Sequence, residues 1–223
     1  MTTTTTHELT GQPTAAISDA LDKLGLPGAL DDIGAITGTG AVYGPAFTVA
    51  YEPVGAEHGT VGDFLDAVPT GAVVVIDNHG RTDCTVWGGI MSRVAHHRGV
   101  AATVVNGVCR DTAEASLLDY PIWARGRFMR TGKDRVRLAA VQQPITIGNV
   151  AIRSGDLVCA DADGVVVVPA SHLSEVARIA RGIEEVEHAI VDSVLTGATL
   201  EDARTRHGYH RLQTAENHGR GTT

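Results

Sequence analysis

Hydrophobic residues follow a helical spacing near both ends of the chain. The clearest segment runs from Ser171 to Leu195, where apolar side chains recur every three or four residues and predict a long helix. The segment from Thr14 to Gly25 has the same spacing over a shorter length, with Thr14 as the predicted N-cap and Gly25 as the stop. Another short helix is expected around Leu200 to Arg204.

Between these helices, short runs rich in valine and isoleucine alternate with helical segments. We expect strands over 42–54, 71–77, 101–105 and 122–125, and helices over 60–68, 90–97 and 112–118. This alternation predicts an α/β core. Asp77 is expected to emerge at the end of its strand, where ligand chemistry often lies. From Val136 to Pro169, turn signals such as Gly148-Asn149 separate short apolar runs and predict a β-rich layer of the same domain.

The length and composition favour one domain and a small-molecule or protein partner. The chain has 223 residues, of which 43% are hydrophobic, so it can bury a substantial core. We expect a flexible start (1–12), a core (13–170), a C-terminal helical arm (171–210) and a flexible tail (211–223). The formal charge of −8, without a basic block, argues against nucleic-acid binding.

The cysteines and the lengths of the apolar runs indicate the cellular compartment in which the protein is expected. Three cysteines without a CxxC pair disfavour a disulfide scaffold and a zinc site, and they fit a reducing cytoplasm. No apolar run approaches the roughly 20 residues of a membrane span, so no membrane partner is expected.

The segment from Val86 to Asp111 carries the most informative chemistry. Gly88-Gly89 permits a ligand to approach the backbone, and the helix expected after it would direct free N–H groups at an anion. Arg110 offers a two-pronged donor for a carboxylate, and Asp111 offers a hard oxygen ligand for Mg²⁺ or Mn²⁺. A site with both suits an oxo acid. The alternative for Arg110 and Asp111 is an ordinary exposed ion pair.

Other polar residues are candidates with structural alternatives. His79, near Asp77 and Asp83 in an expected loop, is a candidate functional histidine; the alternative is a solvated loop histidine without a function. Cys109 has either a pKa lowered by its neighbour or the role of a buried small apolar residue. We interpret the segment 161–164, Asp-Ala-Asp-Gly, as a turn rather than a calcium loop.

The long predicted helix has a carboxylate on its apolar side. At about 100° per residue, Glu187 falls inside the stripe of valine and isoleucine, whereas Glu184 and Glu185 lie progressively outside it. A charged group on a contact surface requires a specific role, so Glu187 is a candidate functional residue.

Several motifs in order make the chain resemble the RraA-like family, which includes 4-hydroxy-4-methyl-2-oxoglutarate/4-carboxy-4-hydroxy-2-oxoadipate aldolases and regulators of ribonuclease E activity. The resemblance extends from about Thr14 to Leu195. The motifs that carry it are Ser18-Asp-Ala-Leu21, Arg81-Thr-Asp-Cys-Thr-Val-Trp-Gly-Gly89, Gly107-Val-Cys-Arg-Asp111, Arg130-Thr-Gly-Lys133, Gly155-Asp156 and Asp161-Ala-Asp-Gly-Val-Val-Val-Val-Pro169.

The resemblance implies a compact α/β/β single domain with a C-terminal helical arm that packs on a neighbouring subunit in a homotrimer or homohexamer. It implies that Arg110 binds the pyruvate carboxylate or enolate, that Asp111 ligates Mg²⁺ or Mn²⁺, and that Glu187 reaches a neighbour's site to support metal-bound water. The backbone amides that would complete the substrate cradle belong to Gly88, Gly89, Ile90 and Met91.

The chain departs from the aldolases at Gly89, where they commonly carry an acidic residue that holds metal-bound water. Loss of such a supporting group typically lowers affinity or activity by about 10- to 100-fold. Either Asp83, Asp77 or His79 compensates, or the reaction differs.

These features predict a cytoplasmic, metal-dependent lyase that cleaves a C–C bond of a 4-hydroxy-2-oxo acid or decarboxylates an oxaloacetate-like acid. The alternative is a noncatalytic, protein-binding regulator of the ribonuclease E inhibitor type. Metal-dependent release of pyruvate from a panel of such acids separates the two.

Overall fold

The computed structural model describes residues 6–55 and 61–212. The strands are β1 Gly34–Thr37, β2 Val42–Pro53, β3 Val73–Thr85, β4 Ala102–Cys109, β5 Ile122–Arg127, β6 Val136–Val141, β7 Ile145–Ile147, β8 Val150–Ile152, β9 Leu157–Ala160 and β10 Val165–Val168. The α-helices are α1 Thr6–Leu9, α2 Thr14–Lys23, α3 Gly89–His97, α4 Thr112–Leu117, α5 Leu173–Leu195 and α6 Leu200–Arg206. Three short 3₁₀ turns cover Leu65–Ala67, Ala170–His172 and Tyr209–Arg211.

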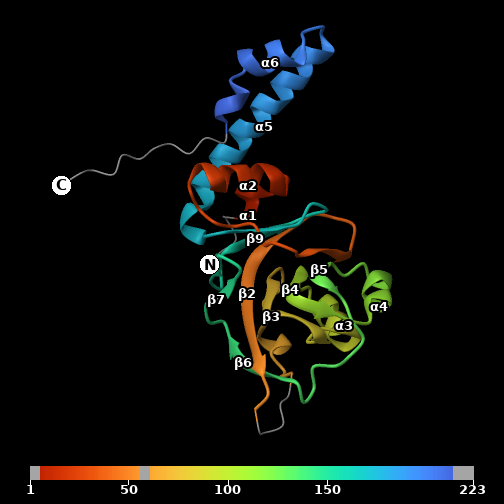
Figure 1. Ribbon diagram of the computed structural model, residues 1–223. Coiled ribbons are helices and arrows are strands. Elements are labelled where there is room, and N and C mark those ends of the chain that lie inside the picture. Colours follow the sequence, from red (N-terminus) through yellow and green to blue (C-terminus); the bar gives the residue numbers. More distant parts are fainter. Residues whose placement is uncertain (1–5, 56–60, 213–223) are drawn as a thin grey trace, which may run out of the picture.

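The valine-rich runs form the centre of the main sheet, which has the order β1-β5-β4-β3-β2-β9-β10. Strands β2 to β5 are parallel, and their apolar residues are buried on both faces, as in other sheets covered on two sides. The long strand β2 is the junction of the fold (Figure 1): its first residues pair with β9, and its last residues pair with β6. The sheet therefore continues from the parallel core into the antiparallel layer.

Three apolar clusters separate the layers. One lies between the sheet and α3 and α4, and includes the buried rings of Trp87 and Tyr120. The second lies on the other face of the sheet, against β7 to β10. The third joins β9 and β10 to α1, α2 and the first half of α5. The expected α/β/β core with its C-terminal helix is confirmed.

Helix α5 belongs partly to the core and partly to the arm. Its first half contributes buried side chains to the third cluster, whereas its second half extends away from the body together with α6 (Figure 1). The described part of the expected N-terminal segment packs on this helix, with Leu9 fully buried and the carbonyl of Glu8 accepting a hydrogen bond from Arg181. In the described part of the chain, no helix is long and apolar enough to cross a membrane.

Three local predictions were wrong. Thr14 is the first residue of α2 rather than its N-cap, and its hydroxyl donates a hydrogen bond to Asp161. The helix expected over 60–68 is a single 3₁₀ turn in its described part, and residue 60 lies outside the described residues. Asp77 does not end its strand, because β3 continues to Thr85 through two irregularities in its pairing with β4.

Candidate functional site

A cleft of about 300 Å³ opens where the chain passes from β3 to α3. The sequence-predicted residues that line it are Gly88, Gly89, Ile90, Met91, Arg110 and Asp111. Residues 61–63, 85–87 and Thr131 complete its walls. Two segments about twenty positions apart meet here because β3 and β4 are neighbouring parallel strands that end at the same edge of the sheet.

The helix start at Gly88 brings the backbone against the arginine and aspartate. A Cβ atom at Gly88 would lie 2.8 Å from Oδ2 of Asp111 and 3.1 Å from Nε of Arg110, so a larger residue would displace both side chains. The N–H of Gly89 donates a hydrogen bond to Oδ2 of Asp111 at 2.9 Å. The carboxylate of Asp111 is therefore the anion at the start of α3. The N–H groups of Ile90 and Met91, also in the first turn, have no partner within the helix.

Arg110 and Asp111 stand side by side at the end of β4. Nε of Arg110 lies 3.6 Å from Oδ2 of Asp111, and the two side chains are 40% and 47% exposed, so both remain accessible to a ligand. Asp111 has a φ of 56°, a left-handed conformation that aspartate tolerates better than most residues. This turn separates β4 from α4 and directs the carboxylate back to Gly89.

Buried hydrogen bonds fix the floor of the cleft. The indole Nε1 of Trp87 donates to Oγ of Ser92 at 3.0 Å, and the Trp87 carbonyl accepts from the N–H of Arg110 at 3.0 Å and from the Thr85 hydroxyl at 2.8 Å. Thr85 also forms a parallel bridge with Thr131 on the opposite wall. The backbone N–H of Arg110 and the strand end at Trp87 are thus held in place before any ligand binds.

The three residues expected to compensate for Gly89 do not line this cleft. Asp77 is buried, and its Oδ1 accepts hydrogen bonds from the Asn106 side chain and from the N–H of His79. Asp83 forms a two-pronged pair with Arg81, at 2.9 and 2.8 Å, which lowers the pKa of Asp83. Both carboxylates are engaged elsewhere.

Glu114 on α4 is a neighbour of Gly89 that the sequence interpretation missed. A Cβ atom at Gly89 would overlap Oε2 of Glu114 and would lie 3.4 Å from Cβ of Asp111. The other oxygen of Glu114 pairs with Nε of Arg93 on α3. The sequence carried only a weak signal for this role. Glu114 lies three residues after Asp111, and residues three apart lie on the same face of a helix.

Glu187 does not approach this cleft within its own chain. It is exposed on the second half of α5, the part that extends with α6 away from the body (Figure 1). Glu184, one turn earlier, is half-buried. The predicted role of Glu187 thus depends on a neighbouring subunit.

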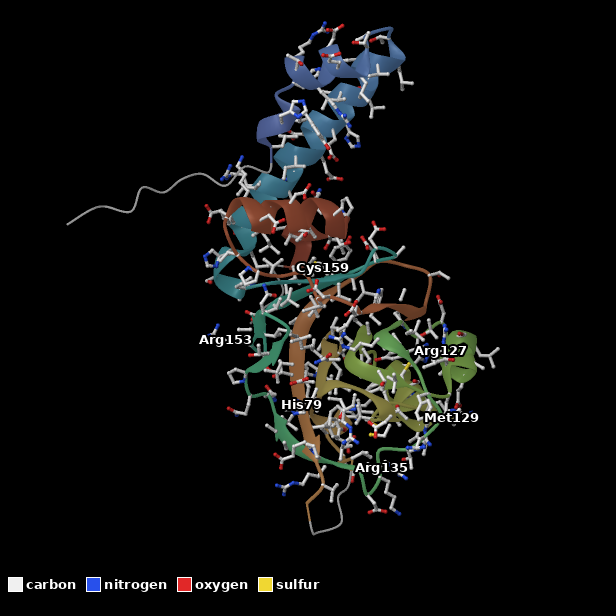
Figure 2. All side chains as sticks on the ribbon, in the orientation of Figure 1. His79, Arg127, Met129, Arg135, Arg153 and Cys159 are labelled. Carbon is white, nitrogen blue, oxygen red and sulfur yellow. The ribbon has the colours of Figure 1, made fainter. Side chains whose placement is uncertain are left out.

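The turn at Arg110 also borders a more open hollow of about 260 Å³ on its other side. Arg127, Phe128 and Met129 line it, and the labelled side chains of Arg127 and Met129 lie at the α4 end of the core (Figure 2). Met129 is 75% exposed.

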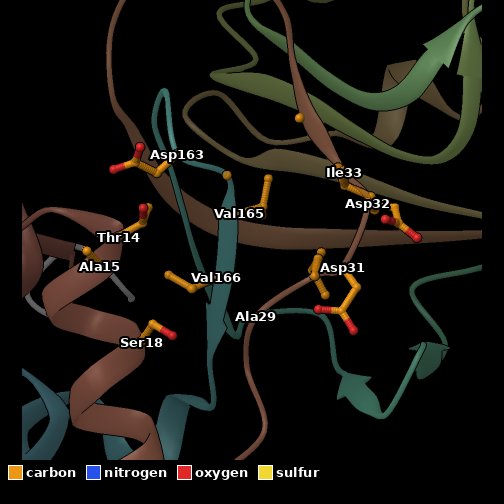
Figure 3. Close-up of a pocket in the computed structure, with 13 residues that line it drawn as sticks. Thr14, Ala15, Ser18, Ala29, Asp31, Asp32, Ile33, Asp163, Val165 and Val166 are labelled. Carbon is orange, nitrogen blue, oxygen red and sulfur yellow. The ribbon is translucent and has the colours of Figure 1, made fainter. Parts of the chain in front are cut away.

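Two larger cavities lack the same chemistry. Figure 3 shows one of about 460 Å³ between α2, the segment before β1, and β10. Its charged lining residues are Asp31, Asp32 and Asp163, which would repel a carboxylate. Another, of about 590 Å³ near Tyr43, has no charged lining residue. Unlike these two cavities, the cleft at Arg110 combines a cation with an adjacent carboxylate.

Cys109 is structural rather than reactive. The side chain is fully buried in the cluster below α3 and α4, and burial raises the pKa of its thiol to about 11. A thiol with a raised pKa is a poor nucleophile at neutral pH. The structure thus favours the buried, apolar interpretation of Cys109.

The fold and cleft define an α/β/β protein with an accessible arginine and aspartate pair at a glycine-rich helix start. The sequence profile of the RraA-like family, described as Aldolase/RraA, matches residues 14–167, and the chain belongs to this family. The resemblance inferred from the motifs is confirmed.

Two similar proteins differ in how much of their own length this chain matches. Protein DlpA of Legionella pneumophila is 38% identical over 200 residues, which cover 88% of this chain but 32% of DlpA, so the chain spans about a third of that relative. A protein of Halalkalibacterium halodurans, provisionally named 4-hydroxy-4-methyl-2-oxoglutarate aldolase, is 36% identical over 189 residues, 82% of this chain and 87% of its own.

A solved structure supports the same fold. RraAS2 of Streptomyces coelicolor, described as an unusual member of the RNase ES inhibitor RraA protein family, is 30% identical. The match covers 82% of this chain and 93% of that protein, with a TM-score of 0.75.

Proposed function

We propose that this protein is a divalent-metal-dependent lyase that cleaves the C–C bond next to a 2-oxo acid. Its reaction is retro-aldol release of pyruvate from a 4-hydroxy-2-oxo acid, or decarboxylation of an oxaloacetate-like acid. The observation that carries this proposal is the placement of Arg110 and Asp111, half-exposed and 3.6 Å apart, in one cleft at a helix start. The provisional aldolase names of relatives agree with it.

The residues present fit Mg²⁺ or Mn²⁺ held partly by water and substrate. Mg²⁺ usually keeps several waters and is bound through one or two carboxylates. Asp111 supplies one such carboxylate, and within residues 6–55 and 61–212 no three acidic, histidine or cysteine side chains converge. When bound, the ion would stabilise negative charge on the 2-oxo oxygen.

The protein's own groups account for the remaining steps. Arg110 binds the substrate carboxylate and stabilises the pyruvate enolate that forms when the C3–C4 bond breaks. In the retro-aldol reaction, the proton of the 4-hydroxyl passes to a water oriented by Glu187 of a neighbouring subunit, and C3 is then protonated to give pyruvate. The fixed backbone at Trp87 keeps Arg110 in place through these steps.

Replacing Arg110 tests the proposal. Pyruvate release from a panel of 4-hydroxy-2-oxo acids and oxaloacetate is followed with lactate dehydrogenase, with Mg²⁺ or a chelator. Arg110→Ala should lower kcat by about 100- to 1000-fold, as loss of an oxyanion donor does. Arg153→Ala, which removes an exposed arginine outside the cleft, is the matched control. Full metal-dependent turnover by Arg110→Ala would refute the mechanism.

We also propose that the protein assembles as a homotrimer or homohexamer in which the arm of one subunit completes the cleft of another. The arm exposes Val191 and Leu195 at 53% and 79%, one turn apart on α5, so apolar side chains are available there for a contact with another subunit. Mixing inactive Arg110→Ala and Glu187→Gln subunits should then regenerate intact sites, roughly one in four after random exchange. Glu185→Gln is the control. Absence of recovery after verified exchange would remove Glu187 from the site.

The second candidate is a noncatalytic regulator that binds another protein. The large exposed side chains near the cleft favour it: Ile90 is 81%, Leu117 is 90% and Met129 is 75% exposed. The similarity to RraAS2 also supports it. Absence of turnover across the whole panel, with the metal present, would favour this candidate over the lyase.

A further inference from the structure

Glu114 occupies the space that a side chain at position 89 would fill. We propose that Glu114 is a positioning residue of the Arg110–Asp111 cleft, which supplies from α4 the second carboxylate that supports the water shell of the divalent ion bound at Asp111. This inference rests on the proposed lyase function, because it presumes a metal at Asp111.

The side chains of Glu114 and Asp111 both lie close to Gly89. Cδ of Glu114 lies 3.0 Å, and Cβ of Asp111 lies 3.4 Å, from the position of a Cβ atom at Gly89. The absence of a side chain at Gly89 is therefore what allows the Glu114 carboxylate to lie against the start of α3. A side chain at position 89 would occupy the space that the Glu114 carboxylate now fills, so the two cannot be present together in this geometry.

Two contacts hold Glu114 in this position. Its N–H donates to the carbonyl of Asp111 at 3.1 Å, which fixes the first turn of α4 beside the aspartate. One carboxylate oxygen pairs with Nε of Arg93, one turn after Gly89 on α3, and the other faces Gly89. The side chain is 28% exposed, so its carboxylate is partly withdrawn from solvent but still reachable by water.

A carboxylate held here has a defined use. Mg²⁺ and Mn²⁺ bound through few protein groups retain waters, and acidic groups beside the ligand accept hydrogen bonds from those waters and strengthen binding. Asp77 and Asp83 are committed to other partners, as described above. Asp63 also lines the cleft, but Glu114 is the acidic residue that meets Asp111 at Gly89, and its Oε2 faces Gly89 rather than Arg93.

Metal binding by the ligand-free protein tests the role without relying on turnover. Mn²⁺ alone is titrated and followed by electron paramagnetic resonance. Glu114→Gln keeps the size of the side chain and should weaken Mn²⁺ binding by about 10- to 100-fold. Glu175→Gln is the matched control, since Glu175 also lies in the first turn of a helix and is exposed. Asp111→Asn should abolish the specific signal.

Moving the carboxylate to the other helix provides the sharper test. Gly89→Asp alone should move the flexible Glu114 carboxylate out of its present position, because the new Cβ overlaps Oε2 of Glu114. Glu114→Ala alone should weaken Mn²⁺ binding. The double variant Gly89→Asp/Glu114→Ala removes the overlap and restores a carboxylate beside Asp111. It should recover Mn²⁺ affinity to within a few-fold of the unmodified protein. A merely structural Glu114 would not give this recovery of affinity.

The outcomes separate this inference from the proposed function. If the unmodified protein binds Mn²⁺ through Asp111 but Glu114→Gln binds it equally well, the inference is wrong and the lyase proposal stands. If Glu114→Gln weakens binding but the double variant does not recover, the carboxylate exchange is wrong. If the unmodified protein binds no Mn²⁺, both proposals fall.

Discussion

Asp161 caps helix α2 from a distant turn, and replacing it would test how the helical layer is attached. Its Oδ2 accepts a hydrogen bond from the N–H of Thr14 at 2.9 Å, and its Oδ1 accepts from the Thr14 hydroxyl at 2.7 Å. Oδ1 also accepts from the N–H of Asp163 at 2.9 Å. Pro13, at the N-cap position itself, makes no side-chain cap. Asp161→Ala therefore removes the cap of α2, although Asp161 lies 147 positions after Thr14 in the sequence.

The expected loss is about 2 kcal/mol. A helix cap contributes about 1 kcal/mol, and a hydrogen bond to a charged group contributes about 1.5–3 kcal/mol. Asp161 is only partly buried, so solvent screening reduces the sum of its hydrogen bonds. In a protein of this size, roughly 2–4 °C of Tm corresponds to each kcal/mol, so Tm should fall by about 4–8 °C.

The free energy of unfolding that is lost in Asp161→Ala should depend on pH in a characteristic way. Burial alone would raise the pKa of Asp161, but the hydrogen bonds from Thr14, Asp163 and Gly164 lower it below its ordinary value. A lowered pKa in the folded state means that the contribution is complete above the unfolded pKa, about 3.9, and is lost as the pH falls through the folded value. The difference between the unmodified protein and Asp161→Ala should be constant from pH 7 to 5 and shrink below pH 4.

Urea unfolding at fixed protein concentration measures this difference, because self-association would otherwise change the apparent stability. Asp163→Ala is the matched control: it removes an exposed carboxylate from the same turn but keeps the N–H that Asp161 accepts. The reasoning is refuted if the two variants are equally stable at pH 7, or if the difference for Asp161→Ala grows toward acid.

Three further predictions concern the cleft. Ser92→Ala removes the partner of the buried Trp87 indole and should cost about 1–3 kcal/mol in urea unfolding; a change below about 0.5 kcal/mol would contradict this. Cys109, with its thiol pKa raised to about 11, is buried like Cys84 and Cys159, so none of the three thiols should react with Ellman's reagent at pH 8 before denaturation. Fast native labelling that is mapped to Cys109 by mass spectrometry would contradict this. Gly88→Ala displaces Asp111 and should lower kcat/KM by about 100-fold with little loss of secondary structure by circular dichroism; near-normal kinetics would mean that the close approach is dispensable.

The valine runs predicted the centre of the sheet because burial on both faces leaves a signal in the sequence. Residues 73–76 are all fully buried, as expected for a covered parallel strand. The extension of β3 to Thr85 left no such signal. Its residues are polar, its path turns through positive φ at His79 and Gly80, and it is held by irregular backbone pairing with β4. Apolar periodicity cannot report pairing that depends on backbone groups.

The candidate site was predictable where chemistry and chain position coincide. Gly88-Gly89 and Arg110-Asp111 each follow a strand, and neighbouring parallel strands place such ends together. Glu114 was not predictable in the same way. Its place depends on how α3 and α4 pack, since its contacts are with Gly89 and Arg93 on the other helix. The cap of α2 by Asp161 was missed for the same reason.

The charges around the cleft indicate an order of binding. Glu114 is balanced by Arg93, which leaves Arg110 facing two lining carboxylates, Asp111 and Asp63, among the described residues. A 2-oxo acid entering this environment meets a net negative surround and gains little from Arg110 alone. A divalent cation at Asp111 reverses the balance and leaves one positive charge, which matches a monoanionic oxo acid. We therefore expect pyruvate to bind measurably by calorimetry only with Mg²⁺ or Mn²⁺ present, and equal affinity without metal would show that this charge argument is wrong.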